Sequence, residues 1–114
     1  MLSVVMAASL LAADVVADAR KKVAEKKYDE AIAQLETAYK AKPAPDVKKA
    51  LAEANLAKAD SFMSNDAAPP RVKYPTALKA YREVLKYDKD NQKAKQNIAT
   101  IEGIYKSMGR PVPQ

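Results

Sequence analysis

Pairs of neighbouring carboxylates are the first residues in this sequence that could do chemistry. Asp29 lies next to Glu30, and one residue separates Asp88 from Asp90. Two adjacent carboxylates can act as general acid and general base, or bind a metal ion together. The chain has no histidine and no cysteine, however, so the commonest general base, the thiol nucleophile and the usual zinc ligands are missing. We therefore expect these carboxylates to stabilise helix N-termini, and we expect no catalytic residues, no cofactor and no metal site.

A dense group of positive charges is the second candidate for a site. Five of the eight residues from Arg20 to Lys27 are Lys or Arg, and the 114-residue chain carries a net charge of +6. Such a cluster could bind the phosphates of a nucleic acid or an anionic surface. It comes without a glycine-rich loop or an interleaved set of aromatic residues, which favours a solvated helix end. Basic nucleic-acid or anionic-surface binding is therefore the alternative function, not the first.

A pattern that occurs twice says more about the protein than either charged cluster. Residues 27–40 read K-Y-D-E-A-I-A-Q-L-E-T-A-Y-K, and residues 73–86 read K-Y-P-T-A-L-K-A-Y-R-E-V-L-K. In both copies the apolar residues follow the spacing of one helix face. A self-similar unit is typical of repeat proteins, in which each unit buries its apolar face against its neighbours.

The composition and the helix-breaking residues predict an all-α fold with five helices. Only two residues are glycine and 48% are hydrophobic, which favours a globular helical chain. Asp46 is the expected N-cap of the third helix, Pro75 the first turn of the fourth, and Gly109 the C-cap of the fifth. The expected helices cover about residues 12–26, 28–41, 46–63, 75–87 and 92–108, with a loop at 64–71 and a tail at 110–114.

The N-terminus leaves two interpretations open. Residues 1–13 are uncharged and rich in apolar and small side chains, but too few to span a bilayer as a helix. They fit the apolar part of a secretory signal peptide, although no Lys or Arg precedes them. Alternatively, they begin the first helix of the domain. We expect a periplasmic or secreted protein in the first case and a cytoplasmic one in the second.

The repeated motif resembles the second helix of the tetratricopeptide repeat (TPR) family. That helix typically opens with a tyrosine, continues with small and large apolar residues at fixed spacing, and is closed by a proline. The first copy matches at Tyr28, Ala31, Leu35, Ala38 and Pro43. The second copy matches at Tyr74, Ala77, Tyr81 and Val84, and Lys89 stands at the place of the closing proline.

The resemblance implies a right-handed array of antiparallel helix hairpins over residues 14–109, with two degenerate repeats and a capping helix. The matching residues would pack between helices, whereas Tyr87 lies outside both stripes and is expected to be exposed. The motif recurs after 46 residues, whereas the family period is about 34. Because the first helices match poorly, the register of the third helix is open by one turn.

The resemblance also implies a non-enzymatic protein–protein interaction or scaffold module. A peptide or helix of a protein partner would bind a concave groove formed by the first and third helices. In the subclass that clamps the C-terminal carboxylate of chaperones, a set of Lys and Asn residues lines this groove. That complete set is absent here in either register, so that ligand is not expected. Self-association would lengthen the short groove. The expected lining is Val16, Arg20, Val23, Ala50, Ala54 and Lys58.

Overall fold

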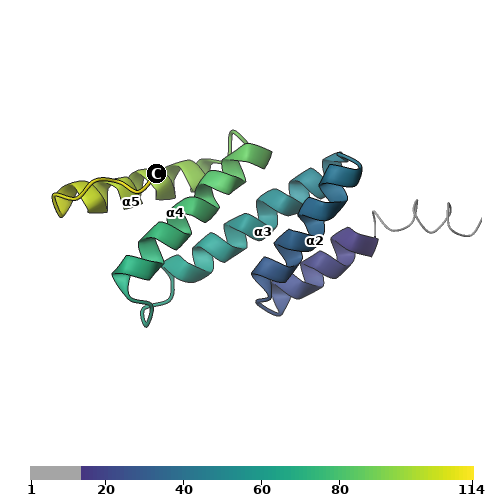
Figure 1. Ribbon diagram of the computed structural model, residues 1–114, viewed down its shortest axis with the longest axis horizontal. Coiled ribbons are helices and arrows are strands. Elements are labelled where there is room, and N and C mark those ends of the chain that lie inside the picture. The colour runs from purple at the N-terminus through teal and green to yellow at the C-terminus, as the bar shows by residue number, and fades with distance from the viewer. Residues whose placement is uncertain (1–13) are drawn as a thin grey trace, which may run out of the picture.

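The computed structural model describes residues 14–114, and every regular element in that range is a helix. Residues 14–24 are helical. They are followed by α2 (Tyr28–Ala41), α3 (Pro45–Met63), α4 (Pro70–Tyr87) and α5 (Gln92–Ser107) (Figure 1). Five helical segments without a strand in this range confirm the all-α prediction. The expected leader, residues 1–13, lies outside the described residues.

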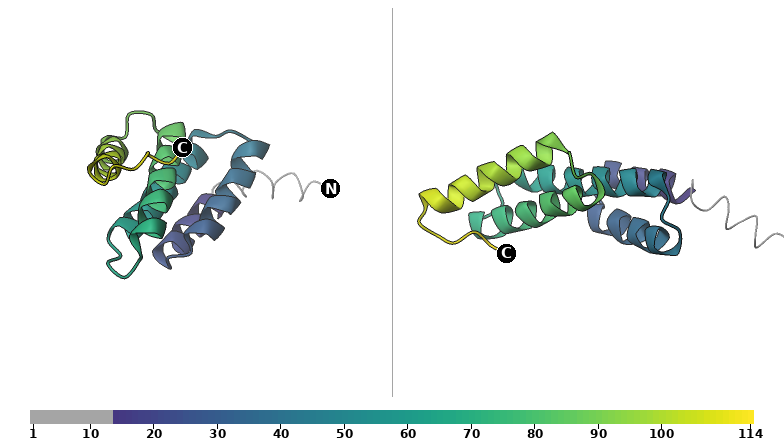
Figure 2. Two further views of the ribbon diagram at one scale, coloured as in Figure 1. Left: turned by 60° about the vertical axis from the view of Figure 1, so that its left-hand side comes forward. Right: turned by 90° about the horizontal axis from the view of Figure 1, so that it is seen from above.

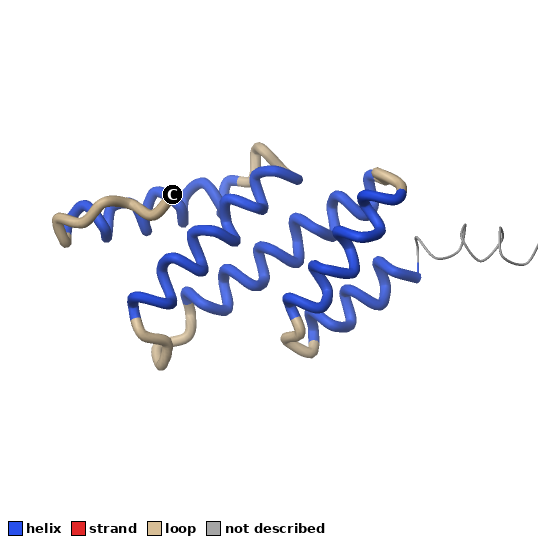
Figure 3. Tube along the Cα trace, in the orientation of Figure 1, coloured by secondary structure: helices blue, strands red, loops and turns tan. Residues whose placement is uncertain are grey.

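Each helix packs against its neighbours in the sequence. α2 contacts α3, α3 contacts α4, and α4 contacts α5. The helices lie side by side in Figures 1 and 2, joined by the short loops coloured tan in Figure 3. Successive helices from α2 to α4 run in opposite directions, and α5 crosses α4 at an angle. The molecule is therefore built from local contacts along the chain.

Two separate hydrophobic clusters share α3. The N-terminal cluster joins Val16 and Ala19 of the 14–24 helix to Leu35 of α2 and Leu51 of α3. The C-terminal cluster contains Ala59 of α3 together with residues of α4 and α5. Because α3 contributes one set of residues to each cluster, it is the central helix of the fold. Its residues are Val47, Ala50, Leu51 and Ala54 in the N-terminal cluster and Ala52 and Ala59 in the C-terminal cluster.

The repeated positions form the centre of these clusters, with three exceptions. Ala31 and Ala77 are both 0% exposed, which allows the paired helices to approach closely. The remaining fully buried repeat positions are Leu35, Tyr81 and Val84. Tyr28, Ala38 and Tyr74 are only half-buried. Tyr28 is the first residue of α2, and Tyr74 packs against the C-terminal cluster from the second turn of α4. Both tyrosines are therefore less completely buried than Tyr81.

Two helix starts differ from the prediction. The N-cap of α3 is Ala44, Pro45 is the first helical residue, and Asp46 lies in the first turn without capping. α4 begins at Pro70, so Pro75 lies inside the helix instead of opening it. Proline suits the first helical turn because its missing N–H is not needed there. Pro45 and Pro70 both use this property, whereas the sequence interpretation expected it at Pro75 and expected Asp46 to be an N-cap.

Two helix C-termini share one backbone arrangement. After α5, the N–H of Gly109 donates to Lys106 and that of Arg110 to Tyr105, both at 3.0 Å. This is a Schellman motif, and Gly109 adopts the positive φ of 67° that it requires. The 14–24 helix ends in the same way, because the N–H of Lys26 donates to the carbonyl of Val23 at 2.9 Å. There, however, the residue with positive φ (65°) is a lysine.

The C-terminal tail folds back against the domain (Figure 1). Val112 packs against the C-terminal cluster. Arg82 of α4 donates from Nη1 to the carbonyl oxygen of Pro113 at 2.8 Å. Residues 110–114 therefore belong to the folded domain, although the sequence suggested only a tail beyond it.

Candidate interaction surface

The predicted groove is closed by packing along most of its length. Ala50 and Ala54 are 3% and 1% exposed and Val16 is 7% exposed, so all three belong to the N-terminal cluster. Arg20, Val23, Ala50 and Ala54 do meet, but around a cavity of only about 60 Å³. The alanines let the 14–24 helix approach α3 so closely that no open groove is left between them. These three buried side chains are therefore core residues and not groove lining.

The two cations of the predicted groove, Arg20 and Lys58, already pair with carboxylates. Arg20 lies 3.4 Å from the carboxylate of Glu53 on α3. Lys58 lies 2.7 Å from the carboxylate of Asp29 on α2. Lys58 is also absent from the cavity that Arg20 borders, so the structure does not bring the six predicted residues into one site.

An open hollow flanks the same stretch of α3, where the α4–α5 turn passes beside it. Its volume is about 360 Å³, at the lower end of the range of ligand sites. Ala52 and Leu56 of α3 and the ring of Tyr87 give it an apolar floor. The exposed Lys48 and Lys49 stand at its edge. The remaining lining residues are Pro45, Glu53, Asp88 and Asn91.

Tyr87 is the surface residue that the sequence interpretation missed. It is half-buried, and its ring meets that of Tyr39 edge to face, with centroids 5.8 Å apart at 89°. Burial raises the pKa of Tyr87, and the nearby carboxylates of Glu36 and Glu83 raise it further. Tyr87 packs against both clusters, so the expectation that it is exposed is wrong. The spacing of apolar residues along one helix face could not reveal a residue that packs between two hydrophobic clusters.

The basic cluster at residues 20–27 is partly neutralised by neighbouring side chains. Besides the pair between Arg20 and Glu53, Lys22 lies 3.2 Å from the carboxylate of Asp18. Lys22 also donates to Gln34 at 2.9 Å. The hydrogen bond from Gln34, followed by the contacts of Lys22, lowers the pKa of Asp18. Two of the five cations are therefore engaged within the N-terminal half, which weakens the case for a phosphate site.

The paired carboxylates lie in structural contacts. Asp29 pairs with Lys58, Asp88 accepts from the Asn91 amide at 3.1 Å, and Asp90 lies 3.9 Å from Lys95. Asn91 in turn caps α5, because its side chain accepts from the N–H of Ala94 at 2.9 Å. In residues 14–114 no three acidic side chains come together as they would around a metal ion.

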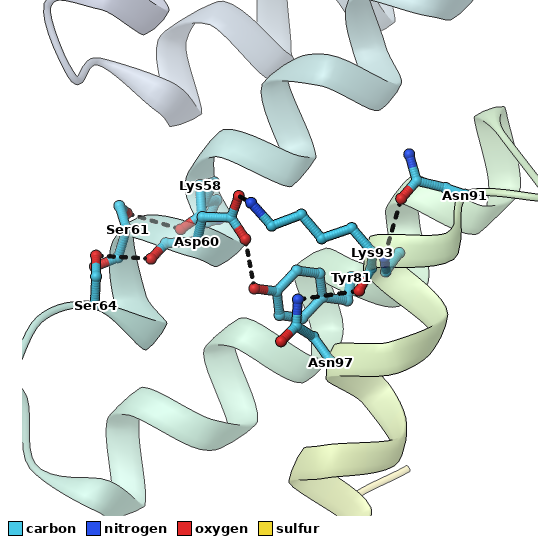
Figure 4. A network of polar contacts seen from close by, with 9 residues as sticks. Lys58, Asp60, Ser61, Ser64, Tyr81, Asn91, Lys93 and Asn97 are labelled. Carbon is cyan, nitrogen blue, oxygen red and sulfur yellow. Dashed lines mark hydrogen bonds and ion pairs between the residues drawn. The ribbon is translucent and has the colours of Figure 1, made fainter.

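Another carboxylate, Asp60, joins three helices (Figure 4). The hydroxyl of Tyr81 on α4 donates to Asp60 on α3 at 2.6 Å, and Lys93 of α5 lies 2.7 Å from the other carboxylate oxygen. Burial raises the pKa of Tyr81 above its ordinary value of 10, and the hydrogen bond to Asp60 raises it further. We call this trio the Asp60 bridge. It fixes α5 onto the α3–α4 pair.

A comparison of the chain with known protein families, characterised proteins and solved structures finds no match. In the described part of the chain, no helix combines the length and the apolar character needed to cross a membrane.

Proposed function

We propose that this protein is a non-enzymatic interaction module of TPR-like architecture. Two helix pairs and a terminal helix would present a rigid surface to a peptide or helix of a partner protein. The repeated motif, the buried alanines at its small positions and the neighbour-to-neighbour packing support this architecture. A protein of this kind works by presenting shape and charge, without a chemical step.

The 360 Å³ hollow beside α3 is the observation that carries the proposal. Leu56 and Tyr87 offer apolar surface at a place that the rest of the fold leaves open. Lys48 and Lys49 are exposed beside it and form no salt bridge with the described residues. The best ligand is therefore a segment that inserts one apolar side chain and carries acidic residues next to it.

The proposed binding combines a small apolar contact with long-range attraction. Burying one large apolar side chain is worth roughly 1.5–3 kcal/mol, and the two lysines add mainly to the rate of association. Micromolar affinity, about −8 kcal/mol, therefore requires further contacts along the bound segment beyond this one side chain. Self-association of the chain would raise the affinity by offering two such hollows.

A double charge reversal tests the proposal. The variant Lys48→Glu with Lys49→Glu should retain its fold, because both side chains are exposed. It should fail to capture, from an extract of the source organism, the protein that the unaltered chain captures. The matched control is Lys40→Glu with Lys42→Glu, which reverses two exposed charges outside the hollow.

The two variants distinguish the hollow from other binding surfaces. Loss of capture only in the variant of Lys48 and Lys49 supports the hollow as the binding surface. Equal capture by both variants contradicts binding at the hollow. Equal loss in both, together with a steep decrease of binding with salt, would favour the alternative of anionic-surface or nucleic-acid binding.

A further inference from the structure

A second and larger groove lies between α2 and α4, with α3 as its floor. Its volume is about 650 Å³. Asn55 and Lys58 line it from α3. No residue of α3 lines both this groove and the first hollow, although Asn55 lies on the same helix side as Lys48 and Ala52 of that hollow. The two openings are therefore neighbours, and the ring of Tyr87 borders both.

The floor of this groove contains a side-chain amide, that of Asn55, which can accept a hydrogen bond from the main chain of a peptide. Asn55 is 4% exposed and is the buried polar residue of the described chain. Its Nδ2 donates to the carbonyl of Leu51 at 2.9 Å. Within residues 14–114 no donor bonds to its Oδ1, and every fully buried side-chain oxygen in that range has a hydrogen-bond partner. Oδ1 is therefore not fully buried, and it reaches the groove. An amide oxygen in such a place is a specific acceptor for a ligand N–H.

The charges along the groove are separated by sign. Lys58 and the exposed Lys79 lie toward one end, and Glu36 and Glu83 lie toward the end that Tyr87 closes. Asp29 partly neutralises Lys58, and Lys86 lies 2.6 Å from Glu83. Lys79 and Glu36 form no salt bridge within the described part of the chain. A ligand would therefore meet one available cation and one available carboxylate.

The Asn55 acceptor selects an extended ligand, because the interior N–H groups of a helical ligand are already bonded within its own helix. The spacing of the charges then sets the spacing of the ligand's charged side chains. Lys79 and Glu83 are four residues apart on α4, which is about 6 Å along the helix axis. In an extended peptide, residues two apart lie on the same face and are separated by roughly 6.6 Å. The lining of α4 runs from Pro75 to Tyr87, or about 18 Å, which corresponds to five or six extended residues.

We propose that the α2–α4 groove binds an extended peptide segment with an acidic and a basic side chain two residues apart. The acidic side chain contacts Lys79, the basic one contacts Glu36 and Glu83, and Asn55 accepts a main-chain N–H. This surface shares Tyr87 with the hollow beside Lys48 and Lys49, but its charged residues Lys79 and Glu36 lie outside that hollow.

Two synthetic peptides test the proposal on the full chain. The probe is acetyl-Ala-Glu-Ala-Lys-Ala-Ala-amide, and the control is acetyl-Ala-Glu-Lys-Ala-Ala-Ala-amide, which places the charges on opposite faces. We expect saturable amide shifts of the protein at Glu36, Asn55 and Lys79 in NMR titrations, with the control binding roughly tenfold or more weakly. No saturable shift with the probe, or equal affinity for both peptides, overturns the proposal.

Variants of exposed residues give the second arm of the test. Lys79→Glu should weaken the binding of the probe peptide roughly tenfold or more. Lys106→Glu, an equal charge change on α5, should leave that affinity unchanged. The Lys48→Glu, Lys49→Glu variant should bind the probe normally even if it fails to capture a partner. Shifts confined to Leu56 and its neighbours would instead assign the peptide to the first hollow and refute the α2–α4 site.

Discussion

The two hydrophobic clusters differ in the polar contacts that hold their helices together. The C-terminal cluster has the Asp60 bridge across α3, α4 and α5, a side-chain cap at Asn91 and a glycine in the left-handed position at Gly109. The N-terminal cluster has exposed ion pairs, such as that of Arg20 with Glu53, and a lysine in the left-handed position. Exposed ion pairs contribute little to stability. The N-terminal half should therefore open at a lower free energy than the C-terminal half.

Truncating one large side chain in each cluster gives the largest expected effect. Leu35 and Leu78 are both 1% exposed, so Leu35→Ala and Leu78→Ala should each cost about 2–5 kcal/mol. Hydrogen exchange should show Leu35→Ala exposing mainly residues 14–41, because the Asp60 bridge still closes the other cluster. Leu78→Ala should accelerate exchange throughout. Identical exchange patterns for the two variants would contradict the ranking of the clusters.

Overpacking the repeat alanines is the next largest change. Ala31→Leu and Ala77→Leu add volume where the exposed fraction is 0%, and each should cost about 1–3 kcal/mol. Ala33→Leu is the control, because Ala33 is exposed on the same helix as Ala31. Thermal melts of the three variants measure the difference. Unchanged melting of both buried variants would refute the repeat-like packing.

Removing the Tyr81 hydroxyl weakens only the C-terminal cluster. Tyr81→Phe should cost about 1–2 kcal/mol at neutral pH, because Asp60 loses a short hydrogen bond. The pKa of Tyr81 is higher in the folded than in the unfolded chain, so this stabilisation is fully present below about pH 10 and decreases as the pH rises above that value. Urea unfolding from pH 7 to 11 should show the variant approaching the unaltered protein at high pH. A constant difference across that range would argue against the contact.

The smallest expected effect is a gain of stability in the N-terminal half. Lys26 has a φ of 65°, which costs a side-chain-bearing residue about 1 kcal/mol. Lys26→Gly should therefore stabilise the protein by up to about 1 kcal/mol. Gly109→Ala, at a φ of 67°, should destabilise it by a similar amount. Chemical denaturation compares the two, and a loss of stability in Lys26→Gly would contradict this account of the N-terminal helix end.

The sequence predicted the helices well because helix stripes are local patterns. α2 has the predicted bounds, and α5 lies within one residue of its prediction at the C-terminus. The start of α4 could not be predicted from Pro75, because Pro70 satisfies the same rule five residues earlier. The prediction of the groove was wrong for a physical reason. An alanine on a helix face gives the same sequence pattern whether it lines an open surface or allows close packing. The Asp60 bridge joins residues from three helices, so no local spacing could indicate it.

The central position of α3 has a consequence for the protein as it is synthesised. The N-terminal cluster is complete once residue 63 has left the ribosome, because α3 provides its last contacts. The other side of α3, with Ala52 and Ala59, stays uncovered until α4, which ends at Tyr87, has emerged. At 5–20 residues per second this interval is about 1–5 s. A nascent chain therefore exposes an apolar helix side for seconds, at the point where a ribosome-associated chaperone would meet it.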